Sequence, residues 1–182
     1  WSRCWNSLNK GLALTFVIAI LDYGSGNLRS AQRAFETSGH NVILTADADI
    51  AREADGLVVP GVGAFAACMN GLQKVNAAEI IAARYADSRP TIGICIGMQI
   101  LFADSDENGV HSGLAIWPTS VRKLSAPVLP HMGWNTVTPA ADSALFKGVE
   151  GESFYFVHSY AVTQSLGKSE SWTDYDTRFL AA

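Results

Sequence analysis

Apolar strands and amphipathic helices alternate through the first hundred residues. Residues 16–21 are apolar and rich in β-branched side chains, and they end in a Gly/Asn-rich turn. Residues 28–37 then repeat apolar positions at helical spacing, and Gly39 ends that predicted helix. The pattern predicts further strands at 41–45, 56–59 and 91–94, and helices at 50–54, 65–72 and 77–85. Such alternation is typical of an α/β protein with a parallel, doubly wound sheet.

The pattern changes beyond Phe102, where an acidic segment leads into short β-rich runs. These runs lie at about 121–124, 134–137 and 153–157, and they predict antiparallel strands appended to the parallel core. The polar stretch 164–176 is predicted to be a loop between two late strands. No linker divides the chain, so we expect one domain over residues 16–182, with residues 1–15 as an extension outside the fold.

Composition excludes several classes of function. The net charge of −4 and the lack of a Lys/Arg run argue against nucleic-acid binding. Three irregularly spaced cysteines argue against a disulfide framework and a structural zinc site, and they favour a reducing cytoplasm. The apolar stretch 12–21 is shorter than the roughly 20 residues of a membrane span. We expect no metal, no cofactor and no membrane partner.

Cys95 is the candidate nucleophile. It ends an apolar strand, between Gly93 and Gly97, and a helical pattern begins directly behind it, as in a nucleophile elbow. There we expect a helix dipole to lower the thiol pKa and the Ile96 amide to point at a developing oxyanion. The alternative is that Cys95 is a small buried hydrophobe.

Several segments together resemble one protein family. The segment around Cys95 (GICIGMQ) resembles the nucleophile motif of class I (triad) glutamine amidotransferases, and residues 60–63 (PGVG) resemble their oxyanion loop. Within that family, the chain is most similar to glutaminase subunits of imidazole glycerol phosphate synthases, through the segments DYGSGNL (22–28), PGVGAF (60–65), PHMGWN (130–135) and FYFVHSY (154–160). The resemblance covers about residues 16–163. It implies a flavodoxin-like, three-layer fold with an antiparallel region appended.

The resemblance implies a role for each matching residue of the nucleophile site. Cys95 would attack the side-chain amide of glutamine and form a thioester. Backbone groups of Val62, Gly63 and Ile96 would frame the oxyanion.

Four other positions match residues that line the glutamine pocket in the family. They are Gln99, Glu107, Ser159 and Tyr160. Their carboxylate, amide and hydroxyl groups suit the polar ends of glutamine. Ser159 and Tyr160 could instead form an ordinary turn at a strand end, and Glu107 could be a solvated charge in its acidic loop.

The family also implies a partner, a cyclase subunit built as a (β/α)₈ barrel that receives ammonia in a heterodimer. Residues 130–135, an exposed-looking loop with His131 and Trp134, are a candidate docking surface. Core packing of Trp134 is an equal alternative.

The general base is not found among the four histidines by motif. The family supplies it in a His-Pro-Glu segment, whereas no Pro-Glu follows His40, His111, His131 or His158. We expect that the chain stops short of this segment and turns glutamine over poorly; a substitute base would first be sought at His158. Two rivals are a glutaminase of another synthase, such as anthranilate or aminodeoxychorismate synthase, and a non-catalytic flavodoxin-like subunit.

Overall fold

The computed structural model describes residues 16–182, whose contacts group into two compact units. Unit 1 comprises the described residues up to Gly63 together with Ala67–Met98, and unit 2 comprises Ala64–Ala66 with Gln99–Ala182. The expected extension at residues 1–15 lies outside the described residues. The single-domain boundary at 16–182 stays a prediction.

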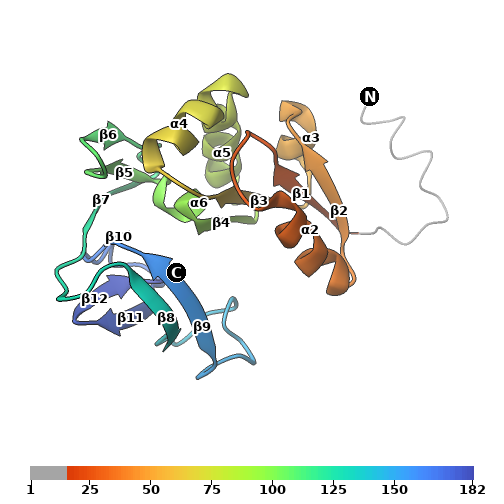
Figure 1. Cartoon of the computed structure of the whole chain (residues 1–182). Coiled ribbons are helices and arrows are strands. Elements are labelled where there is room, and N and C mark those ends of the chain that lie inside the picture. The colour runs from red at the N-terminus through yellow and green to blue at the C-terminus, as the bar shows by residue number, and fades with distance from the viewer. Residues whose placement is uncertain (1–15) are drawn as a thin grey trace, which may run out of the picture. The chain divides into compact units, whose positions relative to one another are not determined.

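Unit 1 contains a parallel four-stranded sheet with the order β2-β1-β3-β4 (Figure 1). Its strands are β1 (Val17–Leu21), β2 (Asn41–Thr45), β3 (Gly56–Gly61) and β4 (Thr91–Cys95). Each pair of neighbours runs in the same direction. The predicted parallel α/β core is therefore confirmed, with each strand within two residues of its predicted bounds.

The helices also follow the sequence pattern. They are α2 (Leu28–Thr37), α3 (Ala48–Glu53), α4 (Phe65–Lys74), α5 (Ala77–Ala86) and the short α6 (Ile96–Gln99). Asn27 caps α2 by accepting a hydrogen bond from the Ser30 amide at 3.2 Å, and Gly39 adopts a φ of 84° after its last turn. No helix described for residues 16–182 has the length and apolar character to cross a membrane.

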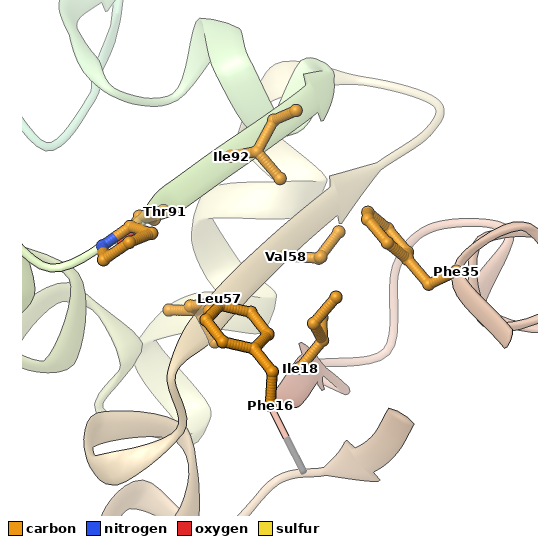
Figure 2. A pocket seen from close by; sticks show the side chains of 9 residues that line it. Phe16, Ile18, Phe35, Leu57, Val58, Thr91 and Ile92 are labelled. Carbon is orange, nitrogen blue, oxygen red and sulfur yellow. The ribbon is translucent and has the colours of Figure 1, made fainter. Parts of the chain in front are cut away.

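The two faces of the sheet in unit 1 are covered differently. Right-handed crossovers place α2 on one face and α3 and α5 on the other. Leu28 and Phe35 of α2 pack against Ile18 and Ile20 of β1. Beside α2 the same face has an apolar hollow, which Figure 2 shows between Phe35 and the strand side chains. Cys95 does not line this hollow.

Arg84 of α5 joins the layer of helices to the sheet. It is fully buried. Its guanidinium donates to the main-chain carbonyls of Ala51, Arg52, Ala54 and Pro90 at 2.7–3.2 Å, and to the Thr91 hydroxyl at 3.2 Å. Within the described residues it forms no ion pair, so carbonyl dipoles at the end of α3 compensate its charge.

Unit 2 is built almost wholly of short strands. They are β5 (Phe102–Ser105), β6 (His111–Ser112), β7 (Trp117–Lys123), β8 (His131–Thr136), β9 (Ser153–His158), β10 (Tyr160–Ala161), β11 (Trp172–Tyr175) and β12 (Thr177–Leu180). They form one sheet with the order β10-β7-β5-β6 and two antiparallel pairs, β8-β9 and β11-β12.

Two predictions for this region need correction. The strands are not all antiparallel, because β5 and β7 pair in parallel. The intervening β6 reverses the chain beside β5, so β7 returns in the original direction. The stretch 164–176 is not only a loop either, because Trp172–Tyr175 forms β11, which pairs with β12.

We predict that Arg84→Met lowers the free energy of unfolding by about 3 kcal/mol, because the buried guanidinium's hydrogen bonds to four main-chain carbonyls are lost. Arg33→Met, at an exposed position of α2, is the matched control and should change stability by less than about 0.5 kcal/mol. Urea denaturation measures both. Equal effects of the two substitutions would contradict the role given to Arg84.

Candidate active site

Cys95 lies at the carboxyl end of β4, directly opposite Gly61 of β3. Its φ is 58°, a left-handed conformation that is uncommon for a residue with a side chain. Such strain typically costs about 1–3 kcal/mol and clusters at functional sites. The strand, the strained residue and α6 directly behind it form the predicted elbow.

Glycines let β3 and the elbow approach each other closely. A Cβ on Gly97 would lie 1.8 Å from the Val59 carbonyl oxygen, and one on Gly61 would lie 2.5 Å from the Gly97 nitrogen. A Cβ on Gly93 would lie 2.3 Å from the Gly97 oxygen. Each of these contacts is with backbone, which cannot move aside as a flexible side chain can. The glycines around Cys95 therefore serve close backbone packing.

Side chains from the turn after β1 hold the loop at residues 60–63. The Ser25 hydroxyl donates to the Val62 carbonyl at 3.1 Å and lies 3.2 Å from the Val62 amide, which donates to it. The Cys68 thiol lies 3.1 Å from the same hydroxyl, and the buried Tyr23 hydroxyl donates to the Pro60 carbonyl. The Val62 amide is thus engaged by Ser25 in this conformation.

Ser25 was not among the predicted site residues. The sequence does contain a signal for it. The turn after β1 and the loop after β3 both follow parallel strands, whose carboxyl ends meet at one edge of the sheet.

The environment of Cys95 raises the pKa of its thiol, contrary to the predicted lowering by a helix dipole. Desolvation by the surrounding protein is the main cause, and the nearby Cys68 adds to it. A hydrogen bond from the Ile96 amide acts in the opposite direction but is the smaller effect. The helix behind Cys95 has only four residues, so its dipole is small.

In unit 2, two of the predicted pocket residues are joined by a hydrogen bond. The side-chain amide of Gln99 donates to the main-chain carbonyl of Tyr160 at 2.9 Å, and Gln99 is only 7% exposed. Ser159 lies between β9 and β10, where its carbonyl accepts from the Leu124 amide at 2.9 Å.

Glu107 is half-buried and is anchored to backbone. Its carboxylate accepts a hydrogen bond from the amide of Phe65, the first residue of α4, at 2.7 Å. Another acidic residue of the same segment, Asp104, forms an ion pair with Arg122. Glu107 is thus held in one place.

His158 is a packed strand histidine in unit 2. One ring nitrogen lies 3.1 Å from the Tyr160 carbonyl, and the other lies 3.1 Å from Nδ1 of His131. Phe179 contacts the ring edge-on at 4.6 Å. With both ring nitrogens engaged, His158 is a poor candidate for a substitute base.

Residues 130–135 differ from the predicted exposed loop. Most of them form β8, and His131 is buried, at 3% exposure. Trp134 is 72% exposed, which decides against core packing of its side chain. On the same face of the β8-β9 pair lie Met132, Tyr155 and Val157, all more than half exposed. These four residues are named the hairpin face below.

Sequence comparisons give consistent relatives. The sequence model of the family described as "Glutamine amidotransferase class-I" matches residues 19–178. A protein of Mycolicibacterium paratuberculosis named imidazole glycerol phosphate synthase subunit HisH is 56% identical over 170 residues, which are 91% of this chain and 82% of that protein. Proteins of the same name from Thermobifida fusca and Corynebacterium glutamicum are 51% and 55% identical, over 91% and 82% of this chain and 83% and 72% of their own lengths.

Solved structures support the fold. A glutamine amidotransferase crystal structure matches with a TM-score of 0.64 and 13% identity, over 81% of this chain and 74% of that one. A putative GMP synthase component from Thermoplasma acidophilum matches with a TM-score of 0.61 and 18% identity, over 92% of this chain and 81% of that one. At such low identities these matches bear on the fold alone.

We predict that the rate of Cys95 alkylation by iodoacetamide rises with pH and has its midpoint above that of an ordinary thiol, about 8.5. The reason is that desolvation raises the thiol pKa, so the reactive thiolate forms only at higher pH. Peptide mass spectrometry follows Cys95 separately from the other cysteines. A peptide with the sequence of residues 93–98 is the control, and an equal or lower midpoint in the folded chain would contradict the prediction.

Proposed function

Because the chain belongs to the class I glutamine amidotransferases, and within them to the HisH subunits of imidazole glycerol phosphate synthase, we propose that Cys95 is the nucleophile that releases ammonia from glutamine. One observation carries this proposal. Cys95 has a left-handed backbone at the carboxyl end of β4, opposite Gly61. The reaction serves histidine biosynthesis, the pathway of this family.

The proposed reaction is an acyl transfer through a thioester. The Cys95 sulfur attacks the side-chain amide carbon of glutamine, and the carbonyl oxygen becomes an oxyanion. The C–N bond then breaks, ammonia leaves with an added proton, and water hydrolyses the thioester to glutamate. We assign the oxyanion to backbone groups of Val62, Gly63 and Ile96. In this conformation the Val62 amide donates to Ser25, which holds the loop in place.

A thiol with a raised pKa needs a base to deprotonate it. In unit 1, His40 precedes β2 and so lies at the amino edge of the sheet, opposite the carboxyl edge that holds Cys95. In unit 2, His131 and His158 bond to each other. The expectation that a His-Pro-Glu segment of the family supplies the base stays a prediction.

The polar residues of unit 2 are proposed to bind glutamine. Glu107 would bind the α-ammonium group, because its carboxylate is held in place by the Phe65 amide. Gln99, Ser159 and Tyr160 would bind the polar groups of the substrate. The hollow beside α2 is a poor candidate for this site, because its lining is almost entirely apolar (Figure 2).

The hairpin face is proposed as the docking surface for the synthase's second subunit. Its four large apolar side chains are exposed, and they include Trp134 and Tyr155, residue types that commonly anchor interfaces. The Trp134 and Tyr155 rings contact each other edge-on, with 5.5 Å between their centroids, which gives the hairpin face a defined shape. We propose that the partner is a cyclase of the (β/α)₈ barrel type that receives the ammonia.

The rival functions receive less support. Relatives at 51–57% identity share the HisH name, which disfavours service to another synthase. A non-catalytic subunit would have no need of a strained cysteine at position 95. The first experiment below separates this rival from the proposal.

Cys95→Ala in the assembled two-subunit enzyme is expected to lower glutamine-dependent product formation at least about 10³-fold. The same enzyme should still form product from added ammonium, since the partner's chemistry is intact. Arg33→Met, at an exposed position of α2, is the control and should retain turnover with glutamine. Undiminished glutamine-dependent turnover of the Cys95→Ala enzyme would favour the non-catalytic rival.

Trp134→Ala is expected to weaken binding of the partner subunit by about thirtyfold, as for an interface anchor worth about 2 kcal/mol. The chain's own stability should hardly change, because the side chain is exposed. Val110→Ala, at another exposed apolar position, is the matched control. Calorimetric titration with the partner measures both, and equal affinities would exclude the hairpin face as the docking surface.

A further inference from the structure

Two histidines and one carbonyl form a hydrogen-bonded chain inside unit 2. His131 of β8 and His158 of β9 lie directly opposite each other in the hairpin, with 3.1 Å between Nδ1 of His131 and Nε2 of His158. Nδ1 of His158 lies 3.1 Å from the main-chain oxygen of Tyr160. The same oxygen accepts the side-chain amide of Gln99 at 2.9 Å.

The donor and acceptor properties of these groups determine which ring nitrogens of His131 and His158 carry a proton. A carbonyl oxygen can only accept, so Nδ1 of His158 must carry the proton that it donates to Tyr160. In the neutral ring Nε2 of His158 is then an acceptor, and Nδ1 of His131 donates to it. Burial lowers the pKa of both rings, which favours this neutral arrangement. His131 therefore selects the tautomer of His158 that can bind Tyr160.

Packing holds the two rings in place. The His131 ring stacks on Tyr175, with 4.0 Å between ring centroids, and on Phe156 at 5.1 Å. Phe179 contacts both histidines edge-on. Because packing already restricts both rings, forming the hydrogen bonds costs little further conformational freedom. The bonds therefore keep a constant geometry.

The Tyr160 carbonyl links the hydrogen-bonded histidines to the proposed glutamine pocket. Its two acceptor positions are used by side chains from different parts of unit 2, one from His158 and one from Gln99. Gln99 is 7% exposed, so a displaced carbonyl would leave its buried amide without a partner.

We infer that His158, oriented by His131, is a positioning residue that fixes the Tyr160 carbonyl and thereby the Gln99 side chain for binding glutamine. This inference rests on the proposed function, because it takes Gln99 and Tyr160 as pocket residues. His158 itself touches no reacting atom in this account. Its effect is on the affinity for glutamine.

The test compares substitutions that place an amide at one ring nitrogen or the other. His158→Asn puts an N–H group where Nδ1 lies and keeps the donor to Tyr160, whereas His158→Gln extends toward Nε2 and does not. His158→Phe keeps the ring and removes both bonds. All are made with Cys95→Ala, so that glutamine is not consumed, and glutamine binding is measured by calorimetry.

We expect His158→Phe and His158→Gln to weaken glutamine binding by about tenfold, and His158→Asn to stay within about threefold of the parent. His40→Asn, in unit 1, is the control and should bind as the parent does. If His158→Phe fails to fold, the comparison of Asn with Gln still decides, because both are polar and of similar size.

The outcomes are distinguishable. Equal affinities for the Asn and Gln variants would overturn the positioning role while leaving the proposed function intact. No glutamine binding by the parent chain would instead count against the proposed function. Nitrogen chemical shifts of His158 give a second readout: the inference requires the Nδ1-protonated tautomer, and the Nε2-protonated form would refute it.

Discussion

The contact between β3 and the turn at Cys95 is the constraint on which the site depends. The backbone at Val59 and Gly61 approaches Gly97 so closely that a single methyl group at Gly61 or Gly97 would overlap main-chain atoms. That approach supports a left-handed φ at Cys95, which a bulkier turn could not hold. The loop that follows Gly61 therefore begins directly opposite Cys95, and its proposed oxyanion role rests on backbone geometry more than on side-chain identity.

Local pattern predicted unit 1 well because burial there repeats at regular intervals. Strands such as Val17–Leu21 are buried on both faces and read as continuous apolar runs, and α2 carries its own caps. Unit 2 is different. Trp172–Tyr175 is short and lies at the end of a polar stretch, and it forms a strand by pairing with Thr177–Leu180. The parallel pairing of β5 with β7 also could not be predicted, because a short sequence segment does not show in which direction two strands run relative to each other.

Some features of the candidate site could likewise be predicted from local sequence, and others could not. Cys95 and its glycines follow from their spacing, since an elbow has a local signature. The pKa of Cys95 could not be predicted, because desolvation depends on neighbours distant in sequence, and it outweighs a helix of four residues. The bond between His131 and His158, 27 residues apart, needs the hairpin register before it can be seen. Ser25 was missed because its partner, Val62, lies on another loop.

Arg84 differs in kind from the other charged contacts of the protein. Arg89 with Glu53 and Arg122 with Asp104 are pairs of full charges that water and dissolved ions reach. Arg84 is sealed from solvent and held by neutral carbonyls. Dissolved ions screen an interaction only weakly when its charged group is buried out of their reach. The junction between α3, α5 and the start of β4 should thus depend far less on ionic strength than the surface ion pairs do.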